Sequence, residues 1–411
     1  MAMPSSTSSS ESPIPADRDP GFDPARLHHA PLSPGLRLTA SDRPGVAQPV
    51  PQRDIPARPW PAIASAALLG VILLSTLWEW QMRRIGLVPG DLGDDPSAWV
   101  EQRRHADAGP GVVAIIGDSR ILFDTDLDRF QRLTGVRPLQ LAIAGTNGLP
   151  FLENLAADTA FSGLAIVGIT ELSYYQPGAG RGSGALARWA WESPKQHASL
   201  LLGRMLKRRL AMLDDSYRFS NIVAREDPDW RPGARGPYDD VWKMMVTVDG
   251  RQSWLWPKLQ HDAALRAHAR MIWLTLFRFA KPTPALIAAA QERTRAAVAK
   301  IRARGGDVVF VRPPSAAPLR PLEDSKLPRA LGWDALLRAA DVRGVHADDL
   351  PAARGLVLPD MSHLTHACAH VFTDVYVRAL AEMTPRLRIM ANAPPALPPA
   401  ACTGPNMQAA P

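Results

Sequence analysis

The chain has 411 residues, of which 46% are hydrophobic and 21% charged, and its formal net charge is +7. This length accommodates one large domain or two small ones. Two cysteines argue against a disulfide-stapled scaffold. The sequence has no nucleic-acid-binding motif, and its aromatic residues do not alternate with basic ones, so the positive charge does not indicate a nucleic-acid partner.

The two ends of the chain differ in composition from the middle. Residues 1–58 are rich in Ser, Pro, Asp and Arg and have no apolar periodicity. Such a stretch buries too little apolar surface to offset its chain entropy, so we predict that it is disordered. Residues 391–411 are rich in Ala and Pro and give the same prediction. Of the two cysteines, Cys402 falls in this tail and Cys368 in a helix that we expect to be buried.

A long apolar segment follows the N-terminal region. Residues 62–78 carry no charge, and with Trp60 and Pro61 they reach the length that spans a bilayer. We therefore predict a single-pass membrane helix over residues 59–82, in contact with the lipid bilayer, and a linker over residues 83–109. Arginines flank the segment on both sides, so the charge rule gives no orientation. The alternatives are a buried core helix or a cleaved signal peptide, and the second is disfavoured by the distance from the N-terminus.

Short apolar runs alternate with helical patterns after residue 110. The expected elements are a strand over 112–116, a helix over 126–133, a strand over 139–143, a helix over 150–160 and a strand over 164–169. This alternation is typical of a parallel sheet with crossover helices.

Residues 178–259 interrupt this alternation. They are rich in Trp, Arg and Pro, and we predict a largely helical insertion that lies over the strand ends and shapes a substrate cleft. After it, the sequence predicts helices over 262–279 and 284–304, a strand over 307–311, a short helix over 333–339 and a last helix over 363–383.

Two short motifs contain the candidate catalytic residues. Gly117-Asp118-Ser119 directly follows the first expected strand, and open α/β sheets bind ligands beyond the carboxyl ends of their strands. Just before the last helix, Asp360-Met361-Ser362-His363 places a carboxylate three residues ahead of a histidine. A serine nucleophile needs a base and a carboxylate that orients that base. We therefore predict Ser119 as nucleophile, His363 as base and Asp360 as the orienting carboxylate.

This ordered pair, G-D-S and then D-x-x-H, resembles the blocks of the SGNH/GDSL hydrolase family over roughly residues 110–385. The resemblance implies a three-layer, flavodoxin-like α/β domain with a central parallel sheet, which we assign to residues 110–390. It also implies a serine mechanism without a metal or another cofactor.

The resemblance further implies an oxyanion hole built from the N–H groups of Ser119 and Gly145. The third family block normally reads G-x-N-[DE], whereas this chain has Gly168-Ile169-Thr170-Glu171. The asparagine donor is therefore missing, and either Thr170 or Asn147 would have to supply the remaining hydrogen bond.

Two arginines lie next to the expected site. Arg120 follows the serine, and Arg312 ends the strand over 307–311. Both are candidate substrate-binding residues, and Arg120 would bind an anionic sugar or phosphate group. For Arg120 the alternative is a structural ion pair with a carboxylate such as Glu171.

These observations predict a membrane-anchored esterase or O-acyltransferase that acts on acyl esters, expected to be acetyl esters, of an envelope or exported polysaccharide. The catalytic domain would be periplasmic, residues 1–58 would lie inside, and other membrane proteins of polysaccharide export are expected partners. One alternative is a non-catalytic scaffold subunit that keeps the fold. Another is a metal-dependent hydrolase, because His363, His366 and His370 fall on one helix face, although Ala367 stands where H-E-x-x-H needs a glutamate.

Overall fold

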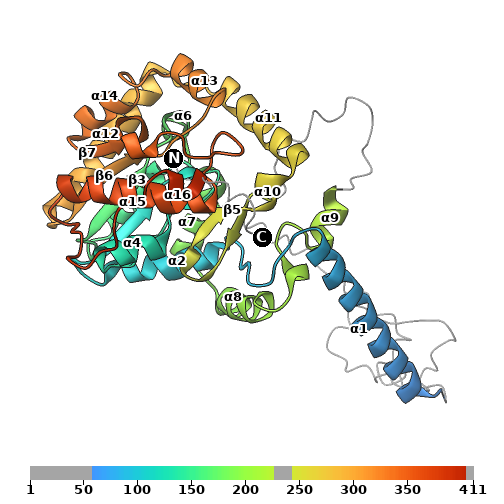
Figure 1. Cartoon of the computed structure of the whole chain (residues 1–411). Coiled ribbons are helices and arrows are strands. Elements are labelled where there is room, and N and C mark those ends of the chain that lie inside the picture. Colours follow the sequence, from blue (N-terminus) through green and yellow to red (C-terminus); the bar gives the residue numbers. More distant parts are fainter. Residues whose placement is uncertain (1–57, 226–242, 404–411) are drawn as a thin grey trace, which may run out of the picture. The chain divides into compact units, whose positions relative to one another are not determined.

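The computed structural model describes residues 58–225 and 243–403 (Figure 1). The contacts within the chain divide it into two units, with the boundary between Ala67 and Leu68. The predictions of disorder for residues 1–57 and 404–411 lie outside the described residues.

Helix α1, Trp60–Arg84, corresponds to the predicted membrane segment. By length and composition it is apolar and long enough to cross a membrane. The most apolar stretch of this helix is not buried inside the described protein, which disagrees with the alternative of a core helix. The predicted linker that follows is only partly a linker, because α2, Pro96–Arg104, packs within it. Trp99 of α2 is buried and donates its indole N–H to the carbonyl of Leu141 at 2.9 Å.

A five-stranded parallel sheet forms the centre of the second unit, as the sequence predicted. Its strands are β1 (Val113–Ile116), β2 (Leu139–Gln140), β3 (Leu164–Gly168), β6 (Asp307–Arg312) and β7 (Arg343–His346), in the spatial order β2-β1-β3-β6-β7. Numbered within the sheet this order is 2-1-3-4-5, one of the two common orders of doubly wound α/β folds. Strand β7 was not predicted, and β2 is shorter than the expected strand over 139–143.

Helices cover both faces of the sheet because successive strand residues point to opposite sides. On one side Ala114, Ile116 and Val167 pack with residues of α5 and α12. On the other side Val113, Ile115 and Ile166 pack with residues of α4 and α15. The bounds of the helices around the sheet are α3 Ser119–Phe123, α4 Leu127–Thr134, α5 Leu149–Ala157, α6 Glu171–Tyr174, α10 Lys258–His261, α11 Ala263–Phe279, α12 Pro284–Ala303, α13 Leu319–Lys326, α14 Trp333–Ala340, α15 His366–Met383 and α16 Ala400–Thr403.

The insertion is helical only in part. It contains α7 (Ser183–Ala190), α8 (Pro194–Lys207) and α9 (Phe219–Arg225), and then an antiparallel hairpin of β4 (Met245–Thr247) and β5 (Ser253–Leu255). The prediction of a largely helical insertion therefore missed the hairpin, whose three-residue strands are too short to show an alternating pattern. Trp230 and Trp242 of the insertion lie outside the described residues.

Side chains of the hairpin reach the main sheet. The guanidinium of Arg251 donates to the carbonyls of Gln140 and Ala142, at the edge strand β2, and pairs with Asp94. The side-chain oxygen of Gln252 accepts from the N–H of Leu127 at the start of α4, at 2.6 Å. The hairpin is thus fixed to the edge of the sheet and to α4.

The C-terminal segment corrects a prediction. Residues 391–403 are not disordered but lie against α15, where Cys402 forms a disulfide with Cys368 at an S–S distance of 2.07 Å. The N–H of Leu397 donates to Asp374 at 3.0 Å, and Arg378 donates to the carbonyl of Pro394. Composition misled here because the segment is held by its backbone groups and one covalent bond, which an Ala- and Pro-rich sequence does not reveal.

Candidate active site

The three residues predicted for a serine site lie in one chain of hydrogen bonds. Nε2 of His363 is 2.8 Å from Oγ of Ser119, and Nδ1 of His363 is 2.6 Å from Oδ2 of Asp360. Asp360 and His363 are buried, whereas Ser119 is partly exposed. With its proton held on Nδ1 by the carboxylate, the imidazole presents the lone pair of Nε2 to the serine hydroxyl.

The turn before Ser119 requires its glycine. Gly117 has a φ of +149°, and a Cβ there would lie 2.6 Å from the side chain of Ile121 and 2.9 Å from the carbonyl of Gly168. Asp118 then caps α3 by accepting a hydrogen bond from the N–H of Arg120 at 3.0 Å. The first two residues of the motif therefore form the turn and begin the helix that presents Ser119.

Four donors surround the Asp360 carboxylate. Its Oδ1 accepts from the N–H groups of Ser362 and His363, and its Oδ2 accepts from His363 and from the indole N–H of Trp273 on α11, at 3.0 Å. Burial alone would raise the pKa of Asp360, but the charge of His363 and the hydrogen bonds from His363 and from the N–H of Ser362 hold that pKa below its ordinary value of 3.8. The carboxylate is therefore kept ionised beside the imidazole.

Three neighbours of the histidine were not predicted. The ring of His363 lies 4.9 Å from that of Phe123 and 5.6 Å from that of Trp273. The fully buried Asp124 accepts a hydrogen bond from the N–H of Leu364 at 2.9 Å, and burial raises its pKa well above the ordinary value. Asp124 thus ties the end of α3 to the residue after His363. No spacing in the sequence marks these residues, because the contacts join segments at least 90 positions apart.

The candidate oxyanion donors differ in their availability. Within the described residues no hydrogen bond uses the N–H of Ser119 or of Gly145, and Gly145 has a φ of +70° in the loop after β2. Thr170, at the end of β3, is buried, and its hydroxyl has no hydrogen-bond partner in the described part of the chain. Asn147, in contrast, uses both ends of its amide on the backbone of Gln176 and Leu149. Of the two alternatives, Thr170 therefore has the free hydroxyl.

Arg120 and Arg312 take part in one buried ion-pair network. Both pair with Glu323 of α13, Arg312 also lies 3.4 Å from Glu171, and Nε of Arg120 donates to Oγ of Ser362 at 3.1 Å. Burial opposes ionisation of Glu323, but the two guanidinium groups lower its pKa to about 2. Each arginine is only 1% exposed, so the geometry favours structural pairing over the tentative assignment to substrate binding. Through Arg120 the network joins the serine helix to the loop that carries His363.

His363, which precedes α15, does not gather with His366 and His370 of α15 into the set that the sequence offered for a metal-dependent hydrolase. His363 faces Asp360 and Ser119, whereas His366 and His370 both turn toward Asp126. The predicted metal alternative based on all three histidines is therefore wrong.

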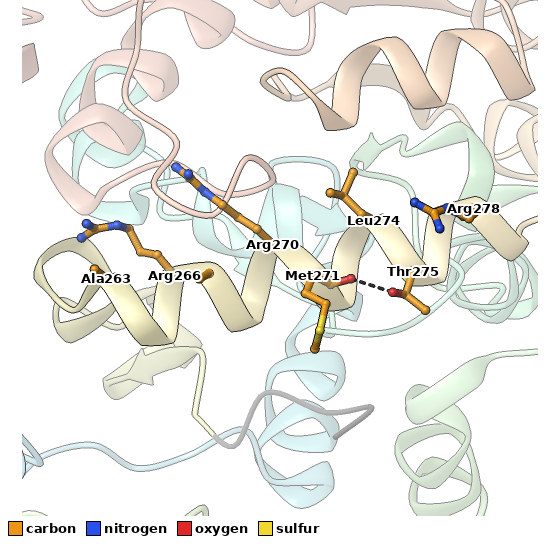
Figure 2. A pocket seen from close by; sticks show the side chains of 8 residues that line it. Ala263, Arg266, Arg270, Met271, Leu274, Thr275 and Arg278 are labelled. Atoms are coloured by element: carbon orange, nitrogen blue, oxygen red, sulfur yellow. Dashed lines mark hydrogen bonds between the residues drawn. The ribbon is translucent and has the colours of Figure 1, made fainter. Parts of the chain in front are cut away.

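A groove runs along α11, and Figure 2 shows the side chains of this helix that line it. Its volume is about 610 Å³, and its described lining includes Arg266, Arg270 and Arg278 together with Met271 and Leu274. Arg270 also donates to the carbonyl of Pro359, the residue before Asp360, at 2.9 Å. This contact places the groove beside the loop that carries Asp360.

A serine hydroxyl hydrogen-bonded to a histidine, which is itself held by a carboxylate, is an arrangement suited to acyl transfer through a covalent intermediate. Free N–H and hydroxyl donors near the nucleophile are what a developing oxyanion requires. No protein-family model matches the chain, and a search of curated proteins finds no significant relative.

Proposed function

We propose that the chain is a membrane-anchored serine esterase or O-acyltransferase of the SGNH type, which acts on acyl esters, in particular acetyl esters, of an envelope or exported polysaccharide. The observation that carries this proposal is the continuous relay from Ser119 through His363 to Asp360, at 2.8 and 2.6 Å. The strand order 2-1-3-4-5 and the position of Ser119 directly after β1 support the SGNH assignment.

The reaction follows from these positions. Ser119 Oγ attacks the ester carbonyl while Nε2 of His363 takes its proton, and Asp360 stabilises the imidazolium. The oxyanion faces the N–H groups of Ser119 and Gly145 and the hydroxyl of Thr170. His363 returns the proton to the leaving sugar hydroxyl, which leaves the acyl group on Ser119. Water or a second sugar hydroxyl then attacks the acyl-enzyme with His363 as base, giving a free acid or a new ester.

Two features support a location at the outer side of a membrane. Helix α1 suits a single membrane span. The disulfide between Cys368 and Cys402 is of a kind that persists in oxidising compartments such as the bacterial periplasm. We therefore place residues 85–411 outside the cytoplasm in this proposal.

A further surface next to the end of α1 supports membrane contact. The carboxylate of Glu79 accepts from the N–H groups of Ala211 and Met212, and the ring of Trp78 lies 6.0 Å from that of Phe219. Helix α8, which lies just before Ala211 in the chain, exposes four apolar side chains: Leu201, Leu202, Met205 and Leu206. Phe219 is exposed as well. We call these five residues the α8 surface. Since it adjoins the end of the membrane helix, we propose that it lies among the lipid headgroups.

The arginines of the α11 groove favour an anionic polymer over a neutral one as substrate. Three guanidinium groups along one groove would attract uronate or similar groups. Comparing deacetylation of an acetylated polyuronate with that of an acetylated neutral glycan tests this preference. A faster reaction on the neutral glycan would contradict it.

The test of catalysis is hydrolysis of p-nitrophenyl acetate by the full chain in detergent, next to its Ser119→Ala and His363→Ala variants. Both should fall to the background rate, whereas the matched control Ser325→Ala, at an exposed position on α13, should match the wild type. A fluorophosphonate probe should label the wild type at Ser119. A folded wild type that neither hydrolyses the ester nor reacts with the probe would contradict the proposal and favour the non-catalytic scaffold, which the substitution of Asn by Thr170 also favours.

A further inference from the structure

A second cluster of polar side chains lies at the start of α15. Nε2 of His370 is 3.0 Å from Oδ2 of Asp126, and Nε2 of His366 is 3.5 Å from the same oxygen. The three potential ligand atoms lie within 4.8 Å of one another. Asp126 caps the start of α4 and is buried, whereas the two imidazoles are each 36% exposed. None of these residues takes part in the relay of Ser119.

The separations fit a small metal ion. Tetrahedral zinc with bonds of about 2.0–2.2 Å to nitrogen and oxygen holds neighbouring ligand atoms about 3.3–3.6 Å apart. The two carboxylate–imidazole separations, 3.0 and 3.5 Å, lie close to that spacing. Two histidines one turn apart on a helix are also a usual pair of zinc ligands.

Hydrogen bonding alone does not account for the cluster. The contact of His370 with Asp126 has the length of a hydrogen bond, but Nε2 of His366 is buried and has no hydrogen-bond partner among the described residues. A cation placed between the three groups would occupy the lone pair of His366 as well as that of His370. It would also neutralise the buried carboxylate, since the guanidinium of nearby Arg129 pairs with Asp374 instead.

The ligand side chains are held in place from behind. The second oxygen of Asp126 accepts from the N–H of Arg129 at 2.5 Å, which fixes the carboxylate. The indole of Trp254 on β5 stacks on the ring of His366, at 4.3 Å between centroids and 6° between planes. Such supporting contacts orient metal ligands before the ion binds.

We propose that Asp126, His366 and His370 form a binding site for a divalent transition-metal ion, with zinc as the expected ion. The two partly exposed imidazoles leave a fourth position open to water. The ion would join the start of α4 to the start of α15, the two helices that follow the segments of Ser119 and His363. Its role is to stabilise this corner of the fold, and it does not depend on the proposed esterase activity.

The test is a metal titration of the untagged full chain in detergent after treatment with a chelator and its removal. Calorimetry with zinc chloride should give one equivalent with a dissociation constant in the micromolar range or below, and saturation should raise the midpoint of thermal unfolding. Cobalt(II) should give visible absorption bands that zinc displaces.

Three variants and a control decide the outcome. His366→Gln, His370→Gln and Asp126→Asn should each weaken zinc binding by at least about tenfold, and asparagine still caps a helix, so Asp126→Asn should fold. The control His261→Gln, an exposed histidine on α10, should bind like the wild type. Absence of saturable binding in the wild type, or equal binding in His370→Gln, would overturn the proposal.

Discussion

Trp273 donates its indole N–H to Oδ2 of Asp360 across 3.0 Å, so a residue of α11 helps to fix the carboxylate of the relay. This oxygen is also the one that faces Nδ1 of His363. Helix α11 therefore contributes to the position of the triad from one side, while it lines the arginine groove shown in Figure 2.

Replacing Asp360 with Asn should be far more damaging than replacing Trp273 with Phe. The amide NH2 group of the asparagine is a donor, so it would face another donor, either the N–H at Nδ1 of His363 or the indole N–H of Trp273. His363 would then favour the tautomer with its proton on Nε2, which should lower kcat by roughly 10⁴-fold. Trp273→Phe removes one of four donors and should cost about 10- to 100-fold. Ester hydrolysis measures both, with the exposed Trp191→Phe as control. Equal losses in the two variants would contradict this ranking.

Thr170 offers a test of the oxyanion site that separates catalysis from folding. Thr170→Val keeps the shape but removes the hydroxyl, so kcat should fall by roughly 10²- to 10³-fold if that hydroxyl binds the oxyanion. The free energy of unfolding should stay the same or rise, because the buried hydroxyl makes no hydrogen bond in the described structure that the substitution could remove. Thr170→Ser should keep most of the activity, and Thr159→Val, at an exposed position in the loop after α5, is the control. An unchanged kcat in Thr170→Val would exclude Thr170 as a donor.

Glu323 should make stability depend on pH in the acidic range. Its pKa is about 2 in the folded chain and 4.5 in the reference state, so its contribution is complete above pH 4.5 and is lost as the pH falls toward 2. The full loss below pH 2 should be about 3 kcal/mol in the free energy of unfolding, of which about 2 kcal/mol should appear between pH 7 and pH 3. Denaturant unfolding at pH 7 and at pH 3 measures it.

Glu323→Gln should lose less free energy of unfolding than the wild type between pH 7 and pH 3. At pH 7 it should be less stable than the wild type, because two buried arginines lose their carboxylate partner. The exposed Glu382→Gln is the matched control. The ion-pair interpretation fails if Glu323→Gln and wild type lose the same free energy between pH 7 and pH 3.

Removal of the disulfide should destabilise the domain. Cys368 and Cys402 are 34 positions apart, and closing a loop of that size stabilises a folded chain by about 4 kcal/mol in the chain-entropy model. Cys402→Ser, and wild type in the presence of a reductant, should therefore unfold at lower denaturant concentration by similar amounts. A wild type whose unfolding is indifferent to reductant would contradict this account.

The α8 surface should lie in the headgroup region when the full chain is in lipid nanodiscs. A bimane label on Leu202→Cys should be quenched by lipids with a nitroxide near the headgroup. The same label on Leu331→Cys, an exposed leucine between α13 and α14, should be quenched much less. Equal quenching at the two positions would show that the α8 surface does not face the membrane.

The sequence predicted the parallel sheet and the relay because their signals are local. Strands β1 and β3 are continuous apolar runs, as buried parallel strands are. The residues that shape each motif lie within the motif itself. Gly117 and Asp118 form the turn before Ser119, and Asp360 accepts from the N–H groups of its own loop. The resemblance of this ordered pair to the SGNH/GDSL blocks then led to the prediction that Ser119 and His363 lie at the same site.

What the sequence did not predict depends on contacts between distant segments. Strand β7, Arg343–His346, lies at the sheet edge and has too few apolar residues to stand out. Glu323 was not recognised as the partner of Arg120, because a single glutamate in a polar helix looks like a solvated residue. Pairing of Cys368 with Cys402 was missed for a similar reason, since composition gave no sign that the last segment folds back on α15.

Arg251 has a consequence for how copies of the protein coexist on a membrane. The carbonyls of Gln140 in β2 and of Ala142 just after it accept from its guanidinium, and the N–H of Ala142 donates to the side chain of Gln140. A sheet edge whose carbonyls are occupied in this way offers fewer backbone groups for another strand to pair with. If α1 tethers the protein to a membrane, as proposed, copies would be confined to two dimensions and meet more often, and the occupied carbonyls at this edge would oppose edge-to-edge aggregation.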